Sequence, residues 1–556
     1  MRGNLPGGGQ QPSRVAEVAV PHAAALAVLI AAIVFFWLIS LTPGMSFRFD
    51  DFGLIISRRG WTWDALFLPN NEHWSTLTVL VFKLLFPIAG FRNYTPYVIA
   101  VILTHVLASI LLFVFVRRHA GPVLALAACL TFAVLGQGAD VMFWATEVSF
   151  AGSTAAGLLA LILLEREARW STAAASAALL ASLMFSGLGL VYLVYVGTAG
   201  LINARPQRAT LALVLPVLAY LTWFLSFGAY ARNYRVSVLG NPAALPQLPG
   251  FVALGLISAV TGVFELPLLA AIPLYWAAGV AIRSGALWRH PNRVVLLGAS
   301  ASLVSFYTLT GVERAYANAI EQRYVYAVAP FILMVAAIAL GRMRWRLARW
   351  PLLVGLVVLT GANFLVVNAM ADSIRHEADA RRSVLQFVDL FRRAPGADLQ
   401  AQFSQKLFPE FIPADYVGAT EALGAPFPVV TWKELQARHS PWVEMAAQAM
   451  FHPTLVPDQD PAAPESPAIC QTIPARSRDI GFDLGPGGTL MVSETLSGVT
   501  YRPVLRGHPD VSPGRPWPAS AARSFRLTPG ANLGWTLQVS TSRSPVTLCA
   551  PVAPTG

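Results

Sequence analysis

Charged side chains are scarce in this chain of 556 residues, where they make up 12% of the total. A typical soluble globular protein has about 25%. Hydrophobic residues make up 55%, the mean hydropathy is +0.56, and the apolar residues are concentrated between positions 20 and 370. The composition excludes a soluble protein over most of the length and predicts an integral membrane protein. After Asp372 the chain becomes mixed in polarity.

Lysine is nearly absent, which bears on the net charge of +11. Of the 40 basic residues only three are lysines, Lys83, Lys406 and Lys433. The arginines cluster between the apolar runs, where a membrane topology requires them, and there is no low-complexity basic tail. The basic charge therefore indicates topology, and we exclude nucleic acid as a partner.

Cysteine is also rare, with three residues. Cys129 lies inside an apolar run, and we interpret it as a small packing residue. Cys470 and Cys549 bracket the last stretch of the polar region, which the topology below assigns to an oxidising compartment. They form a disulfide there, or they are two free buried thiols.

Several common active-site motifs are missing: a phosphate-binding glycine-rich loop, Cys-x-x-Cys and Gly-x-Ser-x-Gly. Residues 1–19 are rich in Gly, Gln and Pro, which predicts a disordered cytoplasmic N-terminus. The first apolar run, 23–41, is long enough to cross a bilayer. It lacks a clear cleavage site, so we expect a signal anchor.

About eleven membrane-spanning helices are predicted, and every second loop between them is rich in arginine. Such loops belong in the cytoplasm, so we expect the N-terminus inside and residues 371–556 outside. The run 251–280 is interrupted at Glu265-Leu266-Pro267, which leaves the count open there. The runs are 23–41, 97–116, 121–137, 147–164, 171–186, 188–203, 209–227, 251–280, 294–310, 325–341 and 351–370.

Residues 74–90 are apolar but are not counted as a span, because counting them would put the arginine clusters outside. Lys83 also lies near the middle of this segment. We interpret it as an amphipathic helix in the outer interface.

The fold class is thus an α-helical polytopic membrane protein with an extracytoplasmic α+β or β-rich domain at the C-terminus. Short β-prone runs from Cys470 onward favour a small sheet module. The predicted boundaries are a transmembrane domain 20–371 with a first outer loop 43–95, a helical and mixed segment 372–452, a linker 453–468, and a β-rich module 469–556.

Acidic residues gather in the predicted outer loops, although they contribute little to topology. This distribution suggests a site on the outer side. The pair Asp50-Asp51 follows the first span directly, and carboxylates beside the hydrocarbon boundary tend to mark function. Alternatively, the pair caps the span and faces water. The outer acidic residues are Asp50, Asp51, Asp64, Glu72, Asp140, Glu147, Glu313 and Glu321.

Short motifs follow one another in these loops in a characteristic order. They are Asp50-Asp51, Glu72-His73, the segment from Phe86 to Gly90-Phe91-Arg92-Asn93-Tyr94, His105, Arg117-Arg118, Asp140 before Trp144, and Glu321-Gln322-Arg323-Tyr324. In order and sidedness, residues 20–345 resemble the GT-C superfamily of polytopic glycosyltransferases. The resemblance includes the protein O-mannosyltransferase-like and tetratricopeptide mannosyltransferase-like branches.

The resemblance implies an enzyme that moves a sugar from a polyprenyl-linked donor to an acceptor hydroxyl outside the membrane. The acceptor would be a glycan, a lipid or a protein. It implies Asp51 or Asp50 as general base and an arginine that stabilises the leaving phosphate. Our first choice is Arg323, with Arg232 and Arg235 as substitutes. The substrate-binding candidates are Glu72, His73, Asp140, Glu147, Arg323 and Tyr324.

Other interpretations stay open at this point. No cofactor is certain from the sequence, and a divalent metal could instead be ligated by Asp50, Asp51, Glu72, His73 and Asp140. A transporter or flippase for a lipid-linked glycan is one alternative, and a non-catalytic scaffold for glycan assembly is another. Trp517 and Trp535 either stack on sugars or form the core of the β-module. We expect a bacterial inner membrane location with a periplasmic C-terminal domain.

Overall fold

The computed structural model describes residues 22–551 with gaps. The gaps are 169, 204–205, 231–240, 268–278, 281–282, 284–287, 315–319, 342–344, 404–411, 458–467, 479, 484–488, 493–498, 506–514, 517–523, 529–534 and 542–544. The predicted disordered N-terminus 1–19, Arg232, Arg235 and Trp517 therefore lie outside the described residues.

The chain divides into two compact units, and each is described by itself. The first comprises Met1–Pro43, Arg58–Leu85 and Thr95–Ser373. The second comprises Gly44–Ser57, Phe86–Tyr94 and Ile374–Gly556. Two parts of the predicted first outer loop, 43–95, thus belong to the second unit, and Asp50 and Asp51 lie in one of them.

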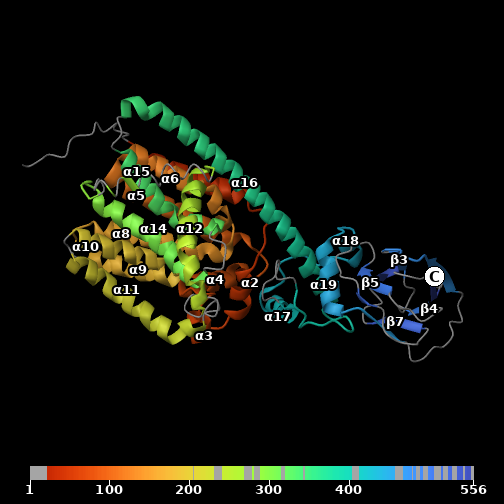
Figure 1. Ribbon diagram of the computed structural model, residues 1–556. Coiled ribbons are helices and arrows are strands. Elements are labelled where there is room, and N and C mark those ends of the chain that lie inside the picture. The colour runs from red at the N-terminus through yellow and green to blue at the C-terminus, as the bar shows by residue number, and fades with distance from the viewer. Residues whose placement is uncertain are drawn as a thin grey trace, which may run out of the picture. The chain divides into compact units, whose positions relative to one another are not determined.

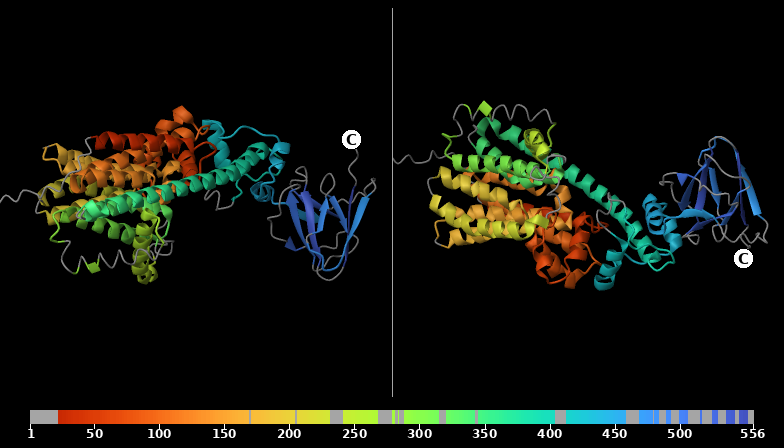
Figure 2. Two further views of the ribbon diagram at one scale, coloured as in Figure 1. Left: turned by 90° about the horizontal axis from the view of Figure 1, so that it is seen from above. Right: turned by 60° about the horizontal axis from the view of Figure 1, so that its bottom comes forward.

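Helices make up the first unit, and most lie side by side in a bundle (Figure 1, Figure 2). They are α1 (Ala23–Ser40), α3 (Trp63–Phe67), α4 (Thr76–Ala89), α5 (Thr95–Ala120), α6 (Pro122–Ala133), η1 (Gly136–Gly138), α7 (Ala139–Met142), η2 (Ala145–Glu147), α8 (Val148–Leu164), α9 (Ser171–Phe185), α10 (Gly189–Ile202), α11 (Pro206–Phe227), η3 (Gly228–Tyr230), η5 (Pro242–Gln247), α12 (Leu248–Phe264), α14 (Arg293–Arg314), α15 (Gln322–Leu340) and α16 (Trp345–Phe391).

Within the described residues, eight helices are long and apolar enough to cross a membrane, or up to nine if α6 and the short helical segment Gly136–Met142 after it form one bent span. Helices α9 and α10 are apolar but shorter, with 15 and 14 residues. Every predicted run contains a helix, and the predicted class of polytopic α-helical membrane protein is confirmed. The count of eleven and the sidedness stay predictions.

Helix α12 departs from the predicted run 251–280, because it ends at Phe264. Glu265 caps it in a left-handed conformation with φ of 46°. An ideal Cβ on Gly255 would clash with Tyr307 near the end of α14, and one on Gly262 would lie 2.9 Å from Val325 in the first turn of α15. Both halves of α12 therefore contact the same end of the α14–α15 pair, and Figure 1 shows α12 running across the direction of α8 and α9.

Helix α4 contains Lys83 but does not expose its charge to lipid. The Lys83 ammonium donates hydrogen bonds to the carbonyl oxygens of Arg58, Arg59 and Gly60, at 2.7, 3.1 and 2.5 Å. It also lies 4.6 Å from the ring centroid of Trp61. Each of its three protons thus has an acceptor.

The length of α4 also argues against a span. Its 14 residues rise about 21 Å, less than the ~30 Å of a hydrocarbon core. The location of α4 in the outer interface stays a prediction.

The second unit contains α2 (Asp50–Ser57), the end of α16 from Ile374, α17 (Pro413–Leu423), α18 (Trp432–Gln436), α19 (Pro441–Phe451) and two antiparallel sheets. The first sheet has the order β1-β7-β4-β9-β2 and the second β3-β8-β5-β6. The strands are β1 (Thr454–Pro457), β2 (Ala468–Ile473), β3 (Ile480–Asp483), β4 (Thr489–Val492), β5 (Val499–Leu505), β6 (Arg515–Pro516), β7 (Ser524–Thr528), β8 (Trp535–Thr541) and β9 (Val546–Pro551).

Residues alternate between buried and half-buried along β8, as expected for a strand with one face on a core. Trp535 opens this strand and is 1% exposed, so it belongs to the core of the sheet region and is not an exposed sugar-stacking residue. The predicted β-rich C-terminal region is confirmed. Strand β1 falls inside the range predicted as a linker.

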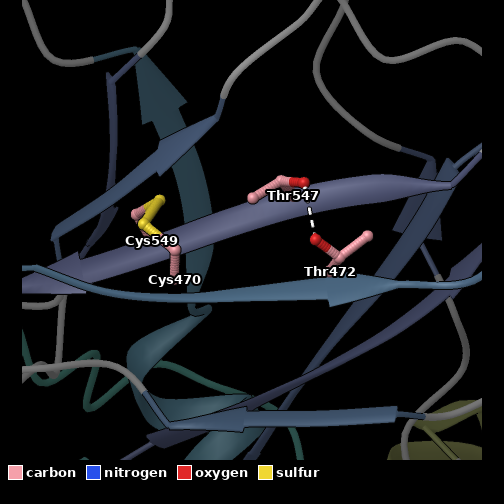
Figure 3. Close-up of a disulfide and its surroundings, with 4 residues drawn as sticks. All are labelled: Cys470, Thr472, Thr547 and Cys549. Atoms are coloured by element: carbon pink, nitrogen blue, oxygen red, sulfur yellow. Dashed lines mark hydrogen bonds between the residues drawn. A yellow bond between two sulfur atoms is a disulfide. The ribbon is translucent and has the colours of Figure 1, made fainter.

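Cys470 and Cys549 form a disulfide (Figure 3). They lie opposite each other on the paired strands β2 and β9, with 4.0 Å between their Cα atoms. Two positions along, the hydroxyls of Thr472 and Thr547 are hydrogen-bonded at 2.9 Å. Of the two alternatives drawn from the sequence, the disulfide is the one observed. Cys129 is buried in α6, as predicted for a packing residue.

Candidate active site

A tight turn between α3 and α4 presents Glu72 and His73. The backbone N–H groups of Asn70 and His73 each donate to the other's carbonyl oxygen at 3.0 Å. Asn71, between them, has a φ of 53°, a left-handed conformation that asparagine adopts more readily than most residues. The side chain of Glu72 is therefore held at the tip of a closed turn.

The turn is anchored to the bundle by tryptophans. Trp74 stacks on Trp223 of α11, with 5.5 Å between ring centroids and 7° between planes. The Trp223 indole donates to the carbonyl oxygen of Phe67 at 2.7 Å. Trp74 and Trp223 form a buried cluster with Leu183, so the position of Glu72 is fixed by the packing of α9 and α11.

Glu72 forms an ion pair with Arg314, the last residue of α14. Only 7% of the Glu72 side chain and 15% of the Arg314 side chain are exposed. Arg314 also donates to the Tyr324 hydroxyl at 3.5 Å. The Nε2 atom of His73 lies 3.5 Å from the Glu72 carboxylate. We call Glu72, His73, Arg314, Arg323 and Tyr324 the polar cluster.

The ionisation of Glu72 reflects this environment. Burial acts to raise its pKa, but the neighbouring His73 and Arg314 outweigh burial, and the pKa of Glu72 lies below its ordinary value. Arg323 contributes in the same direction. Glu72 is therefore a charged partner of the arginines at neutral pH and is not poised as a proton donor.

Arg323 belongs to the first turn of α15 and pairs with Glu321 at 2.7 Å. Its side chain is 24% exposed. The charge of Glu147, which ends η2 and is 5% exposed, also acts on Arg323. Tyr324 is 3% exposed, and Arg323 lies 5.8 Å from its ring centroid. Two guanidinium groups, those of Arg314 and Arg323, are thus brought together by the ends of α14 and α15, and their charges repel.

The structure therefore brings together five of the sequence candidates, Glu72, His73, Glu147, Arg323 and Tyr324. Asp140 is half-buried on the short helix α7. Arg314 is a residue that the sequence reasoning missed. The sequence contained a reason to consider Arg314, because it directly follows Glu313 at the predicted outer end of the run 294–310.

Asp50 and Asp51 lie in the second unit and open helix α2. Asp51 is 0% exposed, and its Oδ2 accepts a hydrogen bond from the backbone N–H of Arg48 at 3.0 Å. Asp50 is half-buried. The two carboxylates are thus distinct: Asp51 fixes the turn that enters α2, and Asp50 keeps part of its surface accessible.

His105, which the family resemblance singled out, is a packing residue of α5. One ring nitrogen is 3.0 Å from the Tyr326 hydroxyl, and the other is 3.1 Å from the carbonyl oxygen of Ala133. The residue is 0% exposed. Both ring nitrogens have partners, so His105 links α5 to α15 and to the end of α6.

The described residues contain no group of three or more His, Cys, Asp or Glu side chains placed to hold a metal ion. The assignment of a metal therefore stays as open as it was from the sequence.

The solved structures that are similar to this chain include those of three other proteins. ArnT from Cupriavidus metallidurans, bound to undecaprenyl phosphate, matches with a TM-score of 0.46 and 14% identity, over 77% of this chain and 88% of ArnT. The Archaeoglobus fulgidus oligosaccharyltransferase, in complex with Zn and sulfate, gives 0.39 and 12%, over 73% and 57%. The arabinosyltransferase EmbB from Mycobacterium smegmatis gives 0.35 and 12%, over 98% and 66%.

No protein-family model matches the chain, and no curated protein sequence matches it. Since every TM-score above is below 0.5, the proposal that follows rests on the residues of this chain.

Proposed function

We propose that this protein is a membrane glycosyltransferase that moves a sugar from a polyprenyl-phosphate-type lipid donor to an acceptor hydroxyl on the extracytoplasmic face. The observation that carries the proposal is the meeting of Arg314 and Arg323 at the ends of two apolar helices. Two arginines in a poorly hydrated place are suited to a phosphate group whose lipid tail stays in the membrane.

The reaction proposed is a direct displacement at the anomeric carbon. A carboxylate takes the proton of the acceptor hydroxyl, and the hydroxyl oxygen forms the new bond to that carbon. The bond between the carbon and the carrier phosphate breaks, and the phosphate oxygen keeps the electron pair. Inversion at the carbon follows from a single displacement.

Asp50 is the proposed base, and Asp51 is a positioning residue. A general base must reach the acceptor hydroxyl, and Asp50 keeps some accessible surface whereas Asp51 is fully buried. The hydrogen bond from Arg48 to Asp51 orients the start of α2, where Asp50 lies. The sequence alone left the choice between these two residues open.

Arg323 is the proposed group that stabilises the negative charge on the leaving phosphate. It is more exposed than Arg314, at 24% against 15% of the side chain. Glu72 neutralises Arg314, and Glu321 orients Arg323 through its Nε atom. The remaining N–H groups of Arg323 are chemically suited to phosphate oxygens.

Membranes containing each variant should be incubated with radiolabelled polyprenyl-phosphate sugars. We expect Asp50→Asn to lower transfer by about 10²–10⁴-fold, the usual contribution of a general base. Arg323→Ala should lower it by a comparable factor, because one stabilising donor is typically worth about 10²–10³. Asp64→Asn is the matched control: its carboxylate belongs to the same loop and is exposed, so transfer should be unchanged. Full transfer by both Asp50→Asn and Arg323→Ala would refute the assignment.

One observation favours a second candidate, a transporter or flippase for a lipid-linked glycan. Transporters often have broken helices with a polar group at the break. Helix α12 ends at Phe264 and is capped by Glu265, whose Oε1 is buried without a hydrogen-bond partner in the described part of the chain. Flux of a labelled lipid-linked sugar across vesicles by the wild type, lost in Glu265→Gln and accompanied by no sugar transfer, would favour this candidate over the enzyme.

A further inference from the structure

Two buried guanidinium groups lie over the same aromatic ring in the second unit. The Cζ atom of Arg48 lies 4.9 Å from the ring centroid of Phe49, and the Cζ atom of Arg381 lies 5.8 Å from the same centroid. Arg48 precedes α2, and Arg381 belongs to the part of α16 that lies in the second unit. Neither arginine was singled out from the sequence.

Arg381 is the more unusual of the two. Its side chain is 0% exposed, and its one ion-pair partner in the described residues is Glu377, at 3.4 Å and 42% exposed. Its Nε and Nη2 atoms are buried without a hydrogen-bond partner among the residues described. A buried guanidinium carries a full charge and N–H donors in a fixed geometry. Leaving those donors without a hydrogen-bond acceptor costs much free energy, unless a bound group supplies the acceptor.

Arg48 places a second positive charge beside Arg381. It is 5% exposed, and its charge repels that of Arg381. The residue whose ring both arginines contact is held in an uncommon conformation: Phe49 has a φ of 40°. Positive φ is rare for an aromatic residue, and such strain tends to occur at functional sites. The other groups that act on Arg381 are Glu377 and the phenol of Tyr94.

We propose that Arg48 and Arg381 form a binding site for an oxyanion, a phosphate or carboxylate group carried by the acceptor substrate. An oxyanion supplies acceptors for the buried N–H groups of Arg381 and cancels the repulsion between the two guanidinium groups. Both guanidinium groups also lie within cation–π distance of the Phe49 ring. The site is distinct from the polar cluster, which comprises different arginines.

The acceptor is the favoured carrier of this oxyanion because of the neighbouring turn. The backbone N–H of Arg48 donates to Asp51, and Asp50 is the proposed base. An anionic group of the acceptor held at Arg48 would therefore place the rest of that molecule near the start of α2. This assignment rests on the proposed function, whereas the oxyanion site itself does not.

The test uses the full-length protein in detergent, with inorganic phosphate and acetate as probes at constant ionic strength. We expect phosphate, acetate or both to raise the Tm of the wild type. Arg381→Gln should abolish that rise, with the probe's Kd weakened by more than about tenfold, as expected when a buried charged contact is lost. Arg48→Gln should act in the same direction, and it keeps the test valid if Arg381→Gln folds poorly.

Arg382→Gln is the matched control, because Arg382 is the next residue on α16 but is 32% exposed and paired with an exposed Asp379. It should respond to the probes like the wild type. The proposal is overturned if neither probe raises the Tm of the wild type, or if Arg381→Gln and Arg48→Gln respond as the wild type does.

The same measurement separates this inference from the proposed function, because it requires no sugar transfer. An arginine-dependent response without any transfer activity would leave the oxyanion site standing and remove the proposed reaction. Sugar transfer that depends on Asp50, without a response to either probe, would support the proposed reaction and overturn the oxyanion site. A wild-type response to vesicles of anionic phospholipid, but to neither small anion, would assign these arginines to lipid headgroups and overturn the acceptor site.

Discussion

The carboxylate of Glu72 and the guanidinium of Arg314 form a largely buried ion pair, although 242 positions separate them in the chain. Glu72 lies at the tip of a short turn in the predicted first outer loop, and Arg314 ends a candidate membrane span. The pair therefore joins the loop to the end of α14. It also leaves Arg323, the neighbouring arginine, as the more exposed cation of the two.

The Glu72–Arg314 pair should contribute more to stability than the Arg323–Glu321 pair beside it. Removing one partner of a buried pair typically costs about 3–5 kcal/mol. We expect Glu72→Gln and Arg314→Gln each to lower the Tm clearly in detergent, and the double variant to lose much less than the sum. Glu321→Gln is the control, because its pair is 24% and 29% exposed and exposed pairs contribute about 0–1 kcal/mol. Additive losses for the first pair would contradict the prediction.

Acidification should remove the contribution of Glu72 to the stability of the folded protein. Its pKa in the folded protein lies below the ordinary value of 4.5, so the stabilisation is fully present above pH 4.5 and is lost as the pH falls through the folded pKa. The difference in Tm between wild type and Glu72→Gln should thus be constant from pH 7 to about 5 and shrink below 4.5. In the Arg314→Gln variant, one cause of the lowered pKa of Glu72 is absent. The difference in Tm between Arg314→Gln and the Arg314→Gln/Glu72→Gln double variant should therefore vary less with pH. A difference that grows on acidification would refute this.

The class of fold could be predicted because it depends on composition and local patterns. Apolar runs of sufficient length form helices, and β-prone runs between Gly and Pro turns form the sheets, whatever their partners. Helix α12 could not be predicted in the same way. Its residues are as apolar as those of a span, but its direction is set by close packing of Gly255 and Gly262 against other helices, which no local pattern encodes.

The site was accessible from the sequence only through charged residues in the loops beside the apolar runs. Glu72, Glu147 and Arg323 are residues of this kind, and the structure brings them into one region of the first unit. Arg381 did not stand out, because it lies among other charged residues on α16. Its burial depends on tertiary packing around Phe49, so the sequence could not reveal that its Nε and Nη2 atoms lack a partner among the described residues.

The disulfide between Cys470 and Cys549 should stabilise the sheet region measurably. It closes a loop with a sequence separation of 79, and removing such a bond typically costs about 2–5 kcal/mol. We expect the Cys470→Ser/Cys549→Ser double variant to be cleaved faster by protease within 454–551, while Cys129→Ser is cleaved at the wild-type rate. Titration of thiols in denaturant should give one thiol per chain before reduction and three after it. Three thiols before reduction would contradict the bond.

The packing of α12 across α14 should depend on the absence of a side chain at Gly255. A Cβ there would overlap the ring of Tyr307, which is fully buried. Overpacking of this kind typically costs about 1–3 kcal/mol, so we expect Gly255→Ala to lower the Tm. Gly250→Ala is the matched control in the same helix, because no atom lies within 4 Å of its Cβ. Alanine favours a helix by up to about 1 kcal/mol over glycine, so the control should be neutral or slightly stabilising. Equal behaviour of the two variants would mean that α12 does not pack closely against α14.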